Sequence, residues 1–362
     1  MNAPVMKLSV PFIPDEGYAR FLARHASNLS SIYFPLPSGP ITDARVRIAH
    51  DLASETQDLC TSLSSLKAMD KYILMNTRFI PPNVYADDTT LSGILDDIAL
   101  LDNSVGIKGI VFSDMYLLRA LDQTGHEIIP RLEAIPGINA MLDSPEKFFS
   151  FFDMLALLRF KKPARIVPDR ALNRNPETLA TLSKAIKAYD PDIRIELLAN
   201  EGCIYQCPFK LSHDAHIALS NTGLAREGTF QMNKNLGCQA YFDVQPHVFL
   251  KSPFIRPEDI HHYRGLADGI KLCGRTRGVG FLERCVSAYA KGNFNGNLLD
   301  LMDTPETLAQ QWHIDNSRLG SRFFTTLTAC TKMCKTCKIC YEMFNKASWK
   351  KEITFKPYKE FK

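Results

Sequence analysis

The chain has 362 residues, of which 45% are hydrophobic and 23% charged, and its formal net charge at pH 7 is only +4. So small a charge argues against a DNA-binding protein and against one held on an anionic membrane surface. No run of 18 apolar residues occurs, and the N-terminus lacks a charged region followed by an apolar one. The sequence therefore predicts neither a membrane span nor a signal peptide and favours a cytoplasmic protein.

Short apolar runs alternate with helical patterns along most of the chain. The runs predicted as strands are 8–12, 31–36, 72–76, 109–114, 131–135, 165–168, 193–199 and 269–273. Helices are predicted at 15–25, 91–101 and 282–291, and two more begin at Ser144-Pro145 and Asn175-Pro176, where a capping side chain precedes proline.

Eight strands in alternation with helices predict an α/β fold, a (β/α)8 TIM-like barrel over residues 1–295. A C-terminal cysteine-rich extension follows over residues 296–362. A doubly wound open sheet is the alternative that the alternation leaves open. The connection between the seventh and eighth strands is unusually long, which is typical of functional insertions, and its residues 240–244 are strand-like.

Cys203 and Cys207 follow the seventh strand directly, at the strand end where a barrel enzyme carries its chemistry. Two thiolates separated by three residues can share one metal cluster, and Cys238 is a candidate third ligand. The alternative is that these cysteines are small buried hydrophobes. The polar neighbours Glu201 and Lys210 argue against an apolar core position.

Four further cysteines, Cys330, Cys334, Cys337 and Cys340, lie within eleven residues near the C-terminus. In a reducing compartment such spacing indicates metal or redox chemistry more than disulfides. The compact run resembles the cysteine run of bacterial ferredoxins, whereas zinc sites usually split their ligands into two distant pairs. The spacing of the first three also matches radical S-adenosylmethionine enzymes, but there the motif follows the first barrel strand.

Polar side chains follow several other predicted strands and would face the same barrel mouth, among them Asp114 and Asn139. After the eighth strand, Lys271 and Arg275 form a candidate clamp for a phosphate or carboxylate. Each of these residues alone is better explained by a structural salt bridge than by ligand binding.

The stretch from Ile195 through Asn200-Glu201-Gly202-Cys203 to His213 resembles the signature region of the collagenase-like "unknown-type" peptidase family. Further resemblance is carried by residues 135–141, 250–259, 270–276 and 289–301. Asn200-Glu201-Gly202 stands where that family commonly has His-Gly-Ala. Relatives in the family's iron–sulfur branch include proteins of oxygen-independent ubiquinone hydroxylation and of RNA hydroxylation.

The resemblance implies a barrel with a [4Fe-4S] cluster at its mouth, with Cys203 and Cys207 as ligands and Cys238 as a later one. The tail cysteines either complete that cluster or hold a second one. We expect oxygen-independent hydroxylation or related redox chemistry on a small-molecule or RNA-borne aromatic substrate. Lys271, Arg275 and Asn139 would bind it, and Asp114 or Glu201 would move protons. The alternatives are an electron-transfer partner of an enzyme of the same family and a peptidase.

Overall fold

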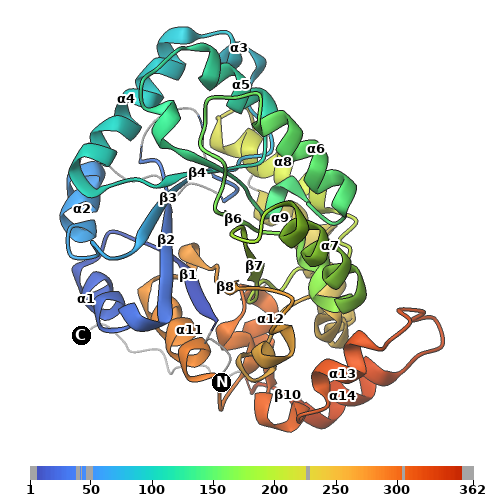
Figure 1. Ribbon diagram of the computed structural model, residues 1–362. Helices are drawn as coiled ribbons and strands as arrows, with labels where there is room; N and C mark the ends of the chain where they lie inside the picture. Colours follow the sequence, from blue (N-terminus) through green and yellow to red (C-terminus); the bar gives the residue numbers. More distant parts are fainter. Residues whose placement is uncertain are drawn as a thin grey trace, which may run out of the picture.

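The computed structural model describes residues 6–37, 41, 43–45, 52–225, 229–303 and 306–352 (Figure 1). The eight barrel strands are β1 (Lys7–Pro11), β2 (Leu29–Pro35), β3 (Asp70–Met75), β4 (Gly109–Phe112), β5 (Glu133–Pro136), β6 (Arg165–Ile166), β7 (Arg194–Leu198) and β8 (Gly269–Lys271). The helices up to β8 are α1 (Glu16–Arg24), α2 (Leu52–Leu63), α3 (Pro82–Tyr85), α4 (Asp88–Val105), α5 (Met115–Gln123), α6 (Pro145–Leu155), α7 (Pro176–Tyr189), α8 (Lys210–Asn221), α9 (Thr229–Asn235) and α10 (Cys238–Val244). After β8 come α11 (Val279–Lys291), α12 (Glu306–Gln311), β9 (Trp312–Ile314), α13 (Phe323–Thr328), α14 (Ile339–Ala347) and β10 (Ser348–Lys350).

All eight strands run parallel in the order β5-β4-β3-β2-β1-β8-β7-β6. The two ends of this order meet, because the Val167 amide donates to the Pro136 carbonyl at 3.3 Å. The sheet is thus nearly closed on itself, with helices around the outside, which confirms the predicted (β/α)8 barrel and excludes the doubly wound sheet.

The buried polar side chains within the barrel are tightly paired. Arg165, 4% exposed, donates to Glu196 at 2.8 Å and to the Ser31 hydroxyl at 2.7 Å. Such buried charges persist only where they are paired and hydrogen-bonded. The main apolar core lies outside, between the strands and the helices, where residues such as Leu95 and Ile110 are fully buried.

The predicted helix starts are confirmed by their caps. The Ser144 hydroxyl accepts from the Lys147 amide at 3.3 Å, and the Asn175 side chain accepts from the Thr178 amide at 3.3 Å. Each cap satisfies an amide that the first helical turn leaves without a partner, and the proline that follows needs none.

The segment 240–244 was predicted as a strand, and that prediction is wrong: it lies in α10. Phe242 is fully buried, whereas Tyr241 and Val244 are 42% and 76% exposed, so only one face of the segment packs. Within the described sheet, the strands on both sides of the β7–β8 insertion already pair with neighbours, which leaves no edge for an added strand.

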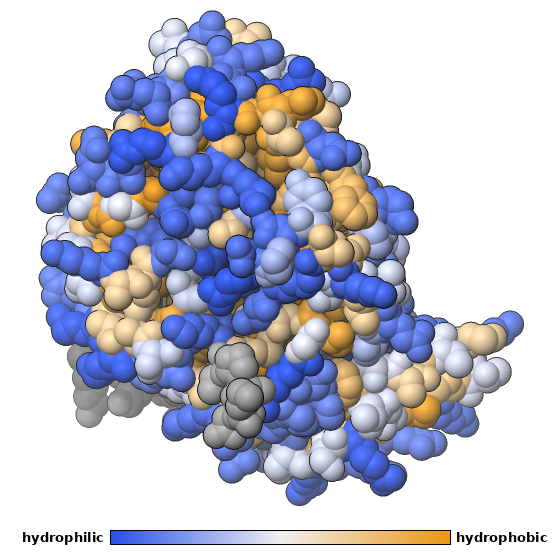
Figure 2. Space-filling model, in the orientation of Figure 1, coloured by the Kyte–Doolittle hydropathy of each residue, from blue (hydrophilic) through white to orange (hydrophobic). Residues whose placement is uncertain are grey.

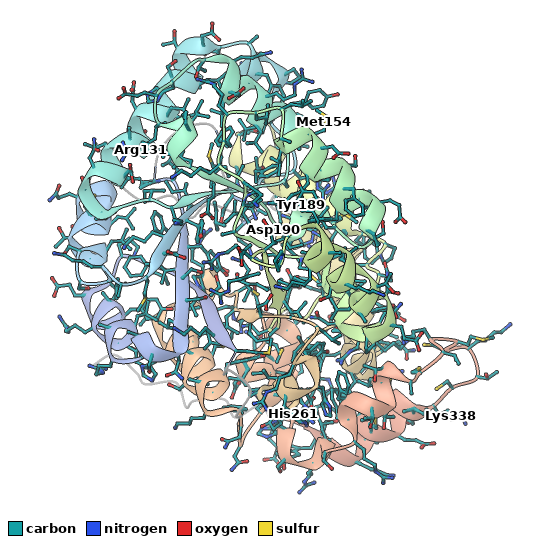
Figure 3. The ribbon with its side chains drawn as sticks, in the orientation of Figure 1. Arg131, Met154, Tyr189, Asp190, His261 and Lys338 are labelled. Atoms are coloured by element: carbon teal, nitrogen blue, oxygen red, sulfur yellow. The ribbon has the colours of Figure 1, made fainter. Side chains whose placement is uncertain are left out.

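The cysteine-rich tail packs beside the barrel rather than within it. β9 and β10 pair antiparallel, and α14 lies against the 3₁₀ helix Pro246–Lys251 of the β7–β8 insertion. Between α13 and α14 the chain makes an extended loop that projects from the body of the molecule, and Lys338 lies in it (Figure 3). Polar residues cover most of the face seen in Figure 2. In the described ranges, no helix is both long and apolar enough to cross a membrane.

Candidate functional site

A cavity of about 110 Å³ opens where the barrel strands end. We call it the mouth cavity, and its polar and cysteine lining is Asp43, Arg45, Asn76, Asn139, Arg170, Glu201, Cys203, Cys207, Lys210, His213, Asp214, Lys271, Cys273 and Arg275. It brings together six of the residues predicted from the sequence, namely Asn139, Glu201, Cys203, Cys207, Lys271 and Arg275.

The loop after β7 places Cys203 and Cys207 on the wall of this cavity. Gln206 has a φ of 49°, so the backbone turns left-handed just before the second cysteine. The Arg170 guanidinium donates to Cys203 Sγ at 3.4 Å. Burial raises the pKa of both thiols, while the positive charges of Arg170 and Lys210 act in the opposite direction.

Cys238 begins α10 and lies outside the lining of the mouth cavity. Burial, with a further contribution from Cys207, raises the pKa of its thiol to about 11. Cys238 in turn contributes to the raised pKa of Cys203.

The charged groups of the mouth cavity are held in ion pairs. Arg45 binds Asp303 at 2.5 Å, Arg275 binds Asp43 at 2.5 Å, Lys210 binds Asp214 at 2.6 Å, and Arg170 binds Glu201. Of the two cations predicted to bind an anion, Lys271 and Arg275, Arg275 is therefore already paired with the Asp43 carboxylate.

Lys271 differs from these cations. No carboxylate of the described residues lies within salt-bridge distance of its amine, which lies 3.3 Å from the centre of the Tyr33 ring. Burial lowers the pKa of Lys271 from 10.5 to about 7, although Glu196 acts in the opposite direction.

The other predicted site residues have structural partners. The Asn139 side chain accepts from Lys210 Nζ at 2.9 Å and donates to the Asn76 carbonyl at 3.3 Å. Asp114 caps α5 by accepting from the Tyr116 and Leu117 amides, and it accepts from the Tyr85 hydroxyl at 2.5 Å. Asp114 does not line the mouth cavity.

Asn200, which is fully buried, fixes the geometry of the mouth. Its amide nitrogen donates to the carbonyls of Cys273 and Leu301 at 3.0 and 3.1 Å, and its oxygen accepts from the Cys273 amide at 2.7 Å. One side chain thus joins the ends of β7 and β8 to the start of the tail.

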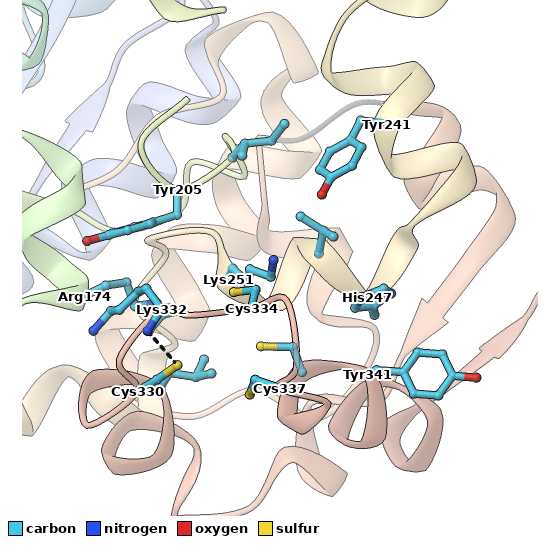
Figure 4. Close-up of a pocket in the computed structure, with 14 residues that line it drawn as sticks. Arg174, Tyr205, Tyr241, His247, Lys251, Cys330, Lys332, Cys334, Cys337 and Tyr341 are labelled. Carbon is cyan, nitrogen blue, oxygen red and sulfur yellow. Dashed lines mark hydrogen bonds between the residues drawn. The ribbon is translucent and has the colours of Figure 1, made fainter. Parts of the chain in front are cut away.

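A second cavity, of about 260 Å³, lies between the barrel and the tail (Figure 4). We call it the tail cavity, and its lining includes Arg174, Ile204, Tyr205, Tyr241, His247, Lys251, Cys330, Lys332, Cys334, Cys337, Cys340 and Tyr341. All four tail cysteines thus border one space. Ile204 and Tyr205 belong to the same loop as Cys203 and Cys207, so this loop separates the two cavities.

The tail thiols influence one another and are close to positive charge. Burial raises the pKa of Cys340 to about 11, Lys251 acts in the opposite direction, and Cys330, Cys334 and Cys337 raise it further. The Lys332 amide donates to Cys330 Sγ at 3.4 Å, and Lys332 has a φ of 61° (Figure 4). Across the described part of the chain, no three Cys, His, Asp or Glu side chains are already arranged to hold a metal ion.

The sequence analysis did not identify the cavity-lining residues that come from distant segments of the chain. Asp43 and Arg45 reach the mouth cavity from the irregular segment after β2, and Lys251 reaches the tail cavity from the β7–β8 insertion. No local motif marks these residues. Cys273 follows β8 and was not predicted as a site residue, yet it lines the mouth cavity.

Comparisons with known proteins agree with the resemblance seen in the sequence. An "Uncharacterized protease MJ1657" of Methanocaldococcus jannaschii is 28% identical over 245 residues, which is 67% of each chain. The structure of the U32 peptidase Mk0906 superposes with a TM-score of 0.51 at 12% identity, covering 76% of this chain and 94% of the other. The structural likeness shows the shared fold, and no family model matches the chain.

Proposed function

We propose that this U32-like barrel is an iron–sulfur enzyme that carries out oxygen-independent hydroxylation or related redox chemistry in its mouth cavity. The observation that carries the proposal is that two cysteine-lined cavities lie on either side of one loop, residues 203–207. Cys203 and Cys207 face the mouth cavity, whereas Tyr205, between them in sequence, faces the cavity of the four tail cysteines.

The tail donor set fits a [4Fe-4S] cluster. Four cysteines border one cavity, an amide donates to one of the sulfurs, and Lys251 and Lys332 supply positive charge beside thiolates that would carry negative charge. Thiolate ligands, amide hydrogen bonds to sulfur and nearby cations are the features that hold and tune such clusters. A bound cluster would supply one-electron redox chemistry.

At the mouth, Cys203, Cys207 and Cys238 form a separate candidate ligand set. Cys203 and Cys207 line the mouth cavity, whereas the four tail cysteines line the tail cavity, so we assign them to two sites rather than to one shared cluster. With three cysteines, the mouth set leaves one ligand position for a substrate or another donor.

The remaining residues of the mouth cavity would bind and orient a small substrate. Asn139 and Arg275 present polar groups to the cavity, and Glu201 is the predicted proton-transfer residue that lines it. A space of about 110 Å³ corresponds to about four water molecules. The cavity as it stands therefore favours a small molecule, or one end of a larger one, over an RNA-borne base.

The test begins with anaerobic purification, followed by iron and sulfide analysis and electron paramagnetic resonance spectra before and after reduction. We expect iron and sulfide in equal amounts, at about four irons for each cluster, and a reducible cluster signal. Small aromatic metabolites and RNA from anaerobic cells with and without the gene should then differ in one hydroxylated species. A chain without iron, or unchanged metabolites and RNA, contradicts the proposal.

The exposure of the tail favours an electron carrier as the second candidate. Cys334 and Cys337 are exposed on the projecting loop, where a protein partner could approach. A carrier would exchange electrons with a partner enzyme of the same family and would leave metabolites unchanged when supplied alone. The names of the relatives keep a peptidase as a third candidate, although none of the described hydrogen bonds joins Cys203 or Cys207 to a histidine.

A further inference from the structure

Among the described residues, Lys271 is the one cation lining the mouth cavity that has no carboxylate partner. Arg45, Arg170, Lys210 and Arg275 each form an ion pair there. Lys271 instead lies with its amine 3.3 Å from the Tyr33 ring centre. An amine without a fixed anion is available either to a ligand or as a nucleophile.

The position of Lys271 is fixed by the barrel. It is the last residue of β8, and its backbone accepts from the Ala199 amide at 2.9 Å and pairs with Ser9 of β1. Tyr33 is held in turn, because its hydroxyl donates to the Leu272 carbonyl. The side chain therefore reaches the cavity from a rigid strand end, which is the precision a covalent site requires.

Burial disfavours the ammonium ion of Lys271, whereas the face of Tyr33 and the charge of Glu196 attract it, so a substantial share of the amine is neutral near pH 7. Lys271 is 8% exposed, its amine lies over the Tyr33 ring, and burial brings its pKa to about 7. Desolvation of this kind converts a lysine from an anion-binding residue into a nucleophile toward carbonyl carbon.

We propose that Lys271 condenses with a small carbonyl compound in the mouth cavity and forms an imine. The Nζ lone pair would attack the carbonyl carbon, and the oxygen would take up a proton. That oxygen would leave as water with the second hydrogen of the amine, giving a C=N bond with no net oxidation or reduction.

The cavity limits the carbonyl compound in size and charge. About 110 Å³ accommodates an aldehyde or 2-oxo acid of a few carbon atoms. Arg275 lines the same cavity and could share its charge between Asp43 and the carboxylate of a 2-oxo acid. This inference does not depend on iron, and it replaces the anion-binding role that the sequence suggested for Lys271.

The test traps the imine on the full-length protein. The chain is incubated with glyoxylate or pyruvate, reduced with sodium borohydride, digested and mapped by mass spectrometry. We expect Lys271 to gain the mass of the probe less one oxygen atom, at least tenfold faster than any exposed lysine. Lys71 is 3% exposed, lies outside the mouth cavity and donates from its amine to the Met69 carbonyl at 3.1 Å, so it should remain unmodified.

Variants then separate the site from general lysine reactivity. Lys271→Met should lose the adduct, whereas Lys71→Met should retain it, with thermal melting used to confirm that both fold. Because the mapping is done first on the unmodified sequence, a misfolded variant does not leave the inference untested. An adduct confined to exposed lysines, or no adduct with either probe, overturns it. The same measurement on iron-free protein should give the same adduct, so its failure is distinct from failure of the iron–sulfur proposal.

Discussion

The mouth cavity and the tail cavity both present cysteine sulfurs, but their walls are held in different ways. At the mouth, Asn200 ties two strand ends to the tail with three hydrogen bonds, and Arg170 is paired with Glu201. In the tail loop, Cys334 and Cys337 are exposed, and the described bonds there are local, such as the one from the Lys332 amide to Cys330. The barrel thus fixes the mouth with contacts between distant segments, whereas the described contacts within the tail loop are few and local.

The largest effect that would sharpen this comparison is at Asn200. Asn200→Ala should lower the free energy of unfolding by about 3 kcal/mol, because it leaves buried carbonyl and amide groups without partners. Chemical denaturation measures it. Asn83→Ala, an exposed position on α3, is the control and should change stability by less than about 0.5 kcal/mol. Equal effects of the two changes would mean that Asn200 does not hold the mouth together.

A smaller effect concerns the pH dependence of the mouth. The folded pKa of Lys271 is about 7 and its ordinary value is 10.5, so between these values the unfolded chain binds more protons and stability rises with pH. From pH 6 to pH 8 the protein should gain about 1.4 kcal/mol relative to Lys271→Met. Because other titrating groups are common to both chains, their contributions cancel in this difference. A difference that stays constant with pH would contradict the buried, neutral amine.

The smallest effect concerns the tail, and it tests whether a metal orders it. Removing iron with a chelator should raise the rate of tryptic cleavage after Lys335 and Lys338 about fivefold, because the loop would lose its ordering ligand. Cleavage within the barrel should not change. Mass spectrometry of the fragments over time gives both rates. Equal tail cleavage with and without iron would mean that the loop takes its structure from the protein alone.

The barrel could be predicted from the sequence because its strands and helices have strong periodic patterns and clear caps, as at Ser144 and Asn175. Residues 240–244 were predicted as a strand because so short an apolar run does not distinguish the helical from the strand period. In the structure the segment is helical, with Phe242 packed in the core.

The site was partly predictable for a similar reason. Residues at strand ends, such as Cys203 and Lys271, meet at the mouth of any parallel barrel, so their position follows from the fold. Asp114 also follows a strand, but its carboxylate caps the next helix. The sequence alone does not distinguish an aspartate that caps a helix from one that faces the cavity. Arg45 follows β2 outside any helix or strand, and Lys251 ends a 3₁₀ helix of the β7–β8 insertion, so the position of each depends on the whole fold.

The most direct test of the account is iron and sulfide content, with electron paramagnetic resonance spectra, in two double variants purified without oxygen. Cys334→Ser/Cys337→Ser removes ligands of the tail set, and Cys203→Ser/Cys207→Ser removes ligands of the mouth set, with Cys60→Ser as the control outside both. Two separate sites predict that each double variant loses the signal of one cluster, about four irons, and keeps the other. Loss of all iron in either double variant would show one shared site, and full iron in both would contradict cysteine ligation at either cavity.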